Sequence, residues 1–240
     1  MSSRTLQSLT VVIPCLDEAG SIGGVVGRLL ESVDPARDRV LVVDNGSRDA
    51  TASTAAAAGA EVVREPRRGY GYACHAGAAA APRGSVLLFL DGDGADDPDE
   101  VRRVLAPVLT GDADLSVGVR RQRAAGSMTL LQAAGNRAAC LLVSLVAGGR
   151  VTDLGSMRAI PASRLLALGM QSRTYGWSTE MTVKALRAGY RYAEVPVRYH
   201  RRAAGESKVS GRPVASLRAG ARIIWTALRW SGWRPTGAVA

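Results

Sequence analysis

Apolar and polar positions alternate in blocks along the first half of the chain, and the period changes from one block to the next. Residues 9–14, 40–44 and 85–90 are short runs of mostly aliphatic residues, which is typical of buried strands. In residues 22–33, apolar residues instead recur three and four positions apart, and this spacing predicts a helix. Strand and helix in repeated alternation predict a parallel, doubly wound α/β sheet.

The alternation becomes less regular after about residue 112. We expect strands near 113–120 and 191–200 and helices near 128–146, 178–190 and 216–233. The stretch 201–213 has little apolar content and predicts a basic loop. These patterns predict a single domain over residues 1–215, followed by an amphipathic basic helix within 216–240.

The composition narrows the range of partners. The chain has 240 residues and a formal net charge of +10, which suits phosphorylated ligands or an anionic membrane surface. No nucleic-acid-binding signature is present, so we expect no nucleic-acid partner. The three cysteines (Cys15, Cys74 and Cys140) are far apart, as expected for reduced core residues in the cytoplasm. The longest apolar run, residues 138–149, is too short to span a bilayer, so we expect no transmembrane anchor.

Carboxylates gather where one predicted strand ends. Asp91 and Asp93 flank Gly92 directly after the aliphatic run 86–90. Alternate residues of an extended segment point the same way, so both carboxylates can face one divalent cation, with diphosphate oxygens and water completing its shell. The alternative is a plain turn before the next helix. We expect Asp96 and Asp97 to cap that helix. In doubly wound sheets, ligands bind beyond such strand ends.

Seven motifs, taken in order, are much more specific than this triplet. They are VVIPCLDEAGSI, VVDNGSRDAT, RRGYGYACHAG, LDGDGADDP, TDLGSMRAI, YGWSTEM and VPVRYHRRAAGESKVSG. This order resembles family 2 glycosyltransferases of the GT-A fold, and is most similar to bacterial dolichol- or polyprenyl-phosphate mannosyl- and glucosyltransferases. The resemblance extends to about residue 213. It implies a mostly parallel central sheet with helices on both faces.

The resemblance also implies an activity. The chain would move a hexose from a UDP- or GDP-linked sugar to a polyprenyl phosphate with inversion. Asp91 and Asp93 would be catalytic and would hold Mg²⁺ or Mn²⁺. The enzyme would lie on the inner face of the cytoplasmic membrane as a peripheral protein. The alternatives are transfer to a hydroxyl of a soluble acceptor, such as a natural product, and nucleotide-sugar binding without turnover.

Further site residues follow from the resemblance in two groups. Those implied to bind the nucleotide sugar are Pro14, Leu16, Glu18, Val42, Asp44, Gly69, Gly71 and Gly92. Those implied to bind phosphate or acceptor are Arg120, Ser156, Arg158, Arg202 and Lys208. Asp44 can instead belong to an Asx-type turn. Ala95 departs from the family, because relatives often have a polar residue there.

Glu180 is the third implied catalytic residue, and its role stays open at this stage. It can be the general base that a hydroxyl acceptor needs, a group that orients the acceptor, or a carboxylate at a helix N-terminus. Asp153 is a second candidate for the base. Neither His75 nor His200 is assigned a catalytic role. The final helix carries arginines and tryptophans that suit an anionic membrane surface, or it is a core-packed helix with a solvated edge.

Overall fold

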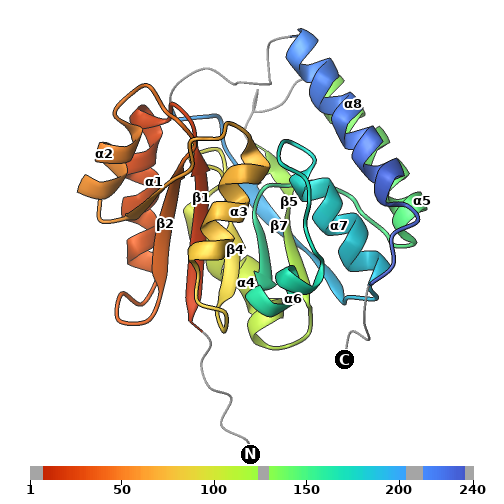
Figure 1. Cartoon of the computed structure of the whole chain (residues 1–240), viewed down its shortest axis with the longest axis horizontal. Coiled ribbons are helices and arrows are strands. Elements are labelled where there is room, and N and C mark those ends of the chain that lie inside the picture. Colours follow the sequence, from red (N-terminus) through yellow and green to blue (C-terminus); the bar gives the residue numbers. More distant parts are fainter. Residues whose placement is uncertain (1–7, 124–129, 204–212, 236–240) are drawn as a thin grey trace, which may run out of the picture.

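The computed structural model describes residues 8–123, 130–203 and 213–235, which form a seven-stranded sheet with flanking helices (Figure 1). The strands are β1 (Leu9–Cys15), β2 (Arg39–Asp44), β3 (Glu61–Arg64), β4 (Val86–Phe89), β5 (Leu115–Arg123), β6 (Arg158–Pro161) and β7 (Tyr192–Tyr199). Their order is β3-β2-β1-β4-β6-β5-β7. Of these seven strands only β6 runs antiparallel to its neighbours, so the prediction of a mostly parallel sheet is confirmed.

Helices cover both faces of the sheet, as predicted. They are α1 (Ala19–Ser32), α2 (Thr51–Ala57), α3 (Tyr70–Ala80), α4 (Val101–Leu109), α5 (Leu130–Ala147), α6 (Ala162–Ala167), α7 (Trp177–Arg187) and α8 (Pro213–Trp230), with a short 3₁₀ helix, η1 (Pro98–Glu100), before α4. Helices α1, α2 and α4 contribute to the apolar cluster on one face, and α3, α6 and α7 to that on the other.

The central strands read as continuous aliphatic runs because both of their faces are buried. In β1, Val11 and Ile13 join the cluster under α1 and α4, whereas Val12 joins the cluster under α3 and α7. All three side chains are fully buried. Cys15 and Cys74 belong to these clusters as free thiols, which confirms that they are core residues.

Helices α5 and α8 lie side by side at one end of the molecule (Figure 1). Both pack against α7, and a third apolar cluster joins the three helices through residues such as Val143, Val183 and Ala227. Helix α8 is the helix expected after residue 215, although it begins at Pro213. The boundary between a domain 1–215 and a separate final helix stays a prediction. Within the described residues, no helix combines the length and apolar character needed to cross a bilayer.

The sheet topology decides which chain segments meet at one edge. Since β1, β2, β4, β5 and β7 run in the same direction, their carboxyl ends lie on the same side. Strand β6 runs the opposite way, so its amino end, which follows Ser156, lies on that side too. Ligands bind at this edge in doubly wound sheets.

Candidate active site

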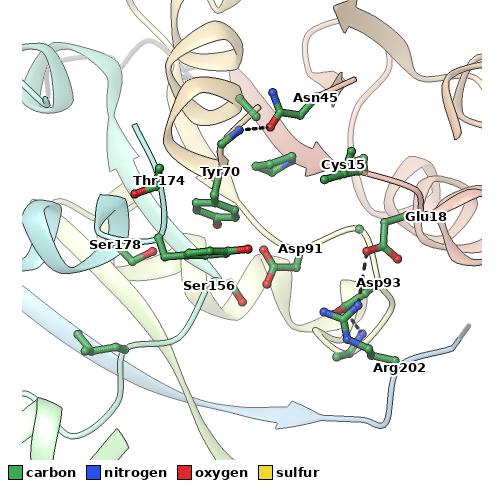
Figure 2. A pocket seen from close by; sticks show the side chains of 18 of the residues that line it. Cys15, Glu18, Asn45, Tyr70, Asp91, Asp93, Ser156, Thr174, Ser178 and Arg202 are labelled. Atoms are coloured by element: carbon green, nitrogen blue, oxygen red, sulfur yellow. Dashed lines mark hydrogen bonds and ion pairs between the residues drawn. The ribbon is translucent and has the colours of Figure 1, made fainter. Parts of the chain in front are cut away.

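A cavity of about 920 Å³ opens at this edge of the sheet, and Figure 2 shows it from close by. The end of β1 and the segment after it contribute Pro14, Cys15, Leu16 and Glu18, and the segment after β4 contributes Asp91, Gly92, Asp93 and Ala95. The remaining lining residues are Asn45, Arg68, Gly69, Tyr70, Ala73, Arg120, Leu154, Ser156, Thr174, Tyr175, Ser178, Thr179, Tyr199, His200, Arg201, Arg202 and Ile223. Segments far apart in the sequence thus share one cavity.

Three carboxylates gather on one side of the cavity. Burial, followed by the negative charges of Asp96 and Asp93, raises the pKa of Asp91 to about 8. Asp96 Oδ2 accepts hydrogen bonds from the Asp91 backbone N–H, at 3.2 Å, and from the Ser156 hydroxyl, at 2.7 Å. In Figure 2 the Asp91 carboxylate points toward the side of the cavity where Tyr70 and Ser156 lie. Acidic groups are therefore crowded together here in a chain that is basic overall, and the raised pKa shows that ionising Asp91 beside its neighbours is unfavourable.

This cluster corrects one prediction and confirms another. Asp97 caps the next helix as expected, because its side chain accepts the Asp99 N–H at 3.2 Å. Asp96 does not cap the helix but turns toward Asp91. The adjacent acids point to different surroundings because successive residues of an extended segment face opposite ways. Asp97 Oδ2 also lies 3.0 Å from His200 Nε2, within hydrogen-bonding distance.

The donor set fits a hard divalent cation. Mg²⁺ and Mn²⁺ prefer oxygen ligands, and the carboxylates of Asp91 and Asp93 both line the cavity. Over the described ranges, no three His, Cys, Asp or Glu side chains are grouped so that they could hold a metal ion by themselves. The residues therefore fit a cation that takes part of its coordination from a bound ligand, which is how Mg²⁺ is commonly held at nucleotide sites.

Two arginines line the cavity together with these acids. Arg202 contacts Asp93 Oδ2 at 2.8 Å and Glu18 Oε1 at 3.4 Å (Figure 2). Arg120 makes a two-point ion pair with Asp153, with 2.8 and 2.6 Å contacts, and its guanidinium lies 5.2 Å from the centre of the Tyr199 ring. Asp153 therefore holds Arg120 in place at the cavity wall. Asp153 is itself buried and does not line the cavity.

The residues implied to bind the nucleotide sugar divide into two sets. Pro14, Leu16, Glu18, Gly69 and Gly92 line the cavity, whereas Val42, Asp44 and Gly71 do not. Val42 is a buried core residue of β2.

At the end of β2, Asp44 makes the Asx-type turn. Its Oδ1 accepts the Ser47 N–H at 3.0 Å. Asn45 lines the cavity instead, and its Oδ1 accepts the Gly69 N–H at 2.7 Å (Figure 2). Local patterning does not distinguish these neighbours, because both are turn-forming residues.

Gly69 and Gly71 allow a close approach of two backbones. A Cβ on Gly69 would lie 2.3 Å from the Arg173 carbonyl oxygen, and one on Gly71 would lie 2.4 Å from the Ser172 carbonyl oxygen. The Tyr72 N–H donates to the Arg173 carbonyl at 3.2 Å across this contact. The glycines thus bring α3 against the segment that carries Thr174 and Tyr175, two cavity residues.

Three more of the expected residues lie away from the cavity or outside the described part of the chain. Arg158 is fully buried, and its guanidinium donates to the Ser178 carbonyl at 2.9 Å and to the Gly155 carbonyl. Burial lowers the pKa of the Arg158 guanidinium. The neighbouring residues in its sequence motif do not indicate that Arg158 is buried. Glu180 is also fully buried and does not line the cavity. Lys208 lies outside the described residues.

Aromatic residues form a part of the wall that the sequence did not single out. Tyr70, Tyr175 and Tyr199 line the cavity. Each stands within or beside one of the motifs, and this proximity was the only available signal. Tyrosines combine an apolar ring with a polar tip, which suits the binding of a sugar or nucleotide.

The doubly wound sheet, with an Asp-Gly-Asp segment and arginines around one cavity at its strand ends, agrees with the GT-A glycosyltransferase fold that the resemblance implied. Residues 10–135 match the sequence family described as Glycosyl transferase family 2, and the chain belongs to this family. An uncharacterized glycosyltransferase of Mycobacterium tuberculosis is 39% identical over 204 residues, which cover 85% of this chain and 90% of that protein.

Two other relatives carry more specific names. The undecaprenyl-phosphate mannosyltransferase of Micrococcus luteus is 34% identical over 241 residues, which cover 93% of this chain and 96% of that protein. Glucosyl-3-phosphoglycerate synthase from M. tuberculosis, solved with Mn²⁺, UDP and glucosyl-3-phosphoglycerate, superposes with a TM-score of 0.72 at 27% identity. The match covers 96% of this chain and 82% of that one. The protein is therefore a glycosyltransferase with relatives that act on different acceptors.

Proposed function

We propose that this glycosyltransferase moves a hexose from a UDP- or GDP-linked sugar to a polyprenyl phosphate, with inversion at the anomeric carbon and with Mg²⁺ or Mn²⁺. One observation carries the proposal. A single cavity combines two carboxylates suited to a metal ion with two arginines suited to phosphate. This combination suits a donor with a diphosphate and an acceptor with a phosphate.

Asp91 and Asp93 would hold the metal ion, which neutralises the charge of the departing nucleoside diphosphate when it is bound. Glu18, Pro14 and Leu16 line the part of the cavity next to these acids, where the nucleoside would bind. Arg202 already contacts Asp93 and Glu18, so it is in reach of a diphosphate bound beside them. Lys208 is proposed to assist it.

Arg120 would bind the acceptor phosphate. Its two-point pairing with Asp153 fixes the guanidinium, so little side-chain entropy is lost when an anion binds. A phosphate monoester is already ionised near neutral pH and needs no general base. One of its oxygens forms the new bond to the anomeric carbon while the bond from that carbon to the diphosphate oxygen breaks.

The surface beside the cavity supports a lipid acceptor. A second pocket of about 520 Å³ is lined by Thr174, Tyr175, Ala221, Arg222 and Trp225. It shares Thr174 and Tyr175 with the main cavity, so the two are neighbours. This pocket leads to the exposed side of α8, where an isoprenoid chain can be accommodated.

Exposed apolar side chains continue over α5 and α8. They are Leu141 and Leu145 on α5 and Ile224, Trp225 and Leu228 on α8. Arg222 and Arg229 stack on Trp225, at 5.3 and 5.0 Å from the ring centre. Exposed apolar residues flanked by arginines suit the headgroup region of an anionic bilayer, so we place the enzyme peripherally on the inner face of the cytoplasmic membrane. Trp230 and Trp233 pack against α7 instead.

A transfer assay tests the proposal. Purified protein is incubated with Mn²⁺ or Mg²⁺, a panel of UDP and GDP sugars, and a short polyprenyl phosphate. We expect one donor to release its nucleoside diphosphate slowly alone and much faster with the lipid phosphate, together with a glycosylated lipid product. Release that the lipid phosphate leaves unchanged contradicts the proposed acceptor.

A soluble acceptor is the second candidate, because the solved M. tuberculosis relative that covers 96% of this chain contains glucosyl-3-phosphoglycerate. A hydroxyl acceptor needs a base. Glu180, a candidate for this base, is buried and does not line the cavity, which weakens this alternative. Phosphoglycerate and other small phosphorylated alcohols belong in the same assay panel, and product formation with one of them but not with the lipid would establish this candidate.

A further inference from the structure

One wall of the cavity is a mostly polar segment whose backbone is fixed by contacts with α7. Residues 169–175 precede α7, and Thr174 and Tyr175 of this segment line the cavity. Gln171, Arg173 and Tyr175 are exposed. Met170 is the one residue of the segment that belongs to an apolar cluster, so the residues after it are ordered only where other groups fix their backbone.

Glu180, in α7, accepts two hydrogen bonds from the backbone of this segment. Its Oε1 accepts the Gln171 N–H at 2.8 Å, and its Oε2 accepts the Ser172 N–H at 2.5 Å. Glu180 is fully buried. Both of its oxygens thus face the backbone of the wall segment and neither is presented to the cavity.

Lys184 lies one helical turn after Glu180 and is fully buried as well. Its Nζ is 2.6 Å from Glu180 Oε1 and donates to the Gly169 carbonyl at 2.8 Å. Burial lowers the pKa of Lys184, and the ion pair with Glu180 opposes that effect. An unpaired buried charge is costly, so each member of the pair stabilises the charged form of the other. Their hydrogen bonds to the backbone of residues 169, 171 and 172 fix this segment to α7.

The end of α8 completes this arrangement. The Lys184 ammonium lies 3.8 Å from the centre of the Trp230 ring and 5.4 Å from that of Trp233. Aromatic faces attract a cation most strongly where water is excluded. The start of α7 meets α8 directly too, since a Cβ on Gly176 would lie 2.4 Å from Thr226 Oγ1.

We infer that Glu180 and Lys184 are a positioning pair that holds residues 169–175 as a wall of the donor cavity. Trp230 of α8 supports this pair through its contact with the Lys184 ammonium. Glu180 then acts through the segment and not as a base on the acceptor. Affinity for the nucleotide depends on α8 through Trp230, although Trp230 does not line the cavity. The inference rests on the proposed function, because it takes the cavity to bind a nucleoside diphosphate sugar.

The first test measures the Kd of UDP and of GDP with Mn²⁺, together with kcat and donor KM, for Glu180→Gln, Lys184→Met and Trp230→Leu. We expect the Kd and KM to rise at least about tenfold in each, which corresponds to about 1.4 kcal/mol of lost binding free energy. The kcat at saturating donor changes less, and its pH profile keeps its shape. Glu61→Gln is the matched control, because it breaks an exposed ion pair with Arg39 at the opposite edge of the sheet.

A double variant separates positioning from stability. Glu180→Gln with Lys184→Met leaves no unpaired buried charge, so the melting temperature should recover relative to Glu180→Gln alone. Nucleotide affinity should stay weak, because a glutamine side chain has one acceptor oxygen for two backbone N–H groups.

Three outcomes would overturn the inference. A fall of kcat by several orders of magnitude in Glu180→Gln with unchanged nucleotide affinity would identify a base. A lower melting temperature with unchanged affinity would leave the pair a purely structural role. Unchanged amide hydrogen exchange of residues 169–175 in Glu180→Gln would show that the pair does not hold the segment, where we expect faster exchange. If the wild type binds neither UDP nor GDP, the proposed function fails and the exchange experiment alone decides whether the pair holds the segment.

Discussion

Gly71→Ala tests how closely α3 approaches the wall of the cavity. The added Cβ would lie 2.4 Å from the Ser172 carbonyl oxygen and 2.7 Å from the Arg173 carbonyl carbon, whereas real Cβ contacts are essentially never under 3.0 Å. The neighbours are backbone atoms and cannot rotate away. Either α3 or residues 172–173 must therefore move by at least 0.6 Å, the difference between 3.0 and 2.4 Å.

Two free energies oppose each other in this variant. Overpacking costs about 1–3 kcal/mol, and replacing glycine by alanine within a helix returns up to about 1 kcal/mol. We expect a net loss of about 1–2 kcal/mol in the free energy of unfolding. For a chain of this size, this lowers the melting temperature by about 2–8 °C.

The same shift moves Thr174 and Tyr175 at the cavity wall. Donor KM should rise by about tenfold or more, since each factor of ten corresponds to about 1.4 kcal/mol of lost donor binding. Thermal unfolding and initial rates at varied donor concentration measure the two effects. Gly24→Ala on the exposed side of α1 is the control, since no atom lies within 4 Å of its added Cβ. It should raise stability by about 0.5–1 kcal/mol and leave KM unchanged.

The combination of the two effects distinguishes the possible roles of Gly71. A raised KM with unchanged stability would mean that Gly71 contacts the nucleotide, as the family resemblance implied. Unchanged KM and unchanged melting temperature would refute the close approach itself.

Three further predictions concern the metal site, the pH dependence of stability and the membrane surface. Asp93→Asn, or removal of metal by EDTA, should lower transfer at least about 100-fold, and added Mn²⁺ should restore only the wild type; full activity of the variant would contradict the metal role. Burial lowers the pKa of His75 to about 4, so the unfolded chain binds more protons between about pH 6.5 and 4. Stability should therefore fall as the pH falls through this window, and urea titrations of His75→Gln should show a smaller fall; an equal fall would contradict the assignment. Leu228→Glu should weaken sedimentation with anionic vesicles about tenfold or more, whereas Leu166→Glu on α6, where the leucine is more exposed still, should not; equal effects would exclude α8 as the membrane surface.

Some features of this protein were set by the sequence alone. The aliphatic runs and the helical spacing that follows them are local signals, so the mostly parallel sheet with helices on both faces was predictable. The position of Asp91 and Asp93 at a strand end was also predictable, because in a doubly wound sheet the end of a strand is the edge where ligands bind. The motifs around them carried the family.

Only the tertiary structure decided which polar groups meet. Strand β6 enters the sheet antiparallel between β4 and β5, and this insertion brings Ser156 to Asp96. Glu180 occupies the first turn of its helix as the motif suggested, yet its carboxylate is satisfied by the amides of Gln171 and Ser172. Periodicity indicates which face of a helix is buried, but it does not indicate which long-range partner a buried charge will find. That choice depends on the sheet order and on how closely backbones approach, and both are properties of the folded chain.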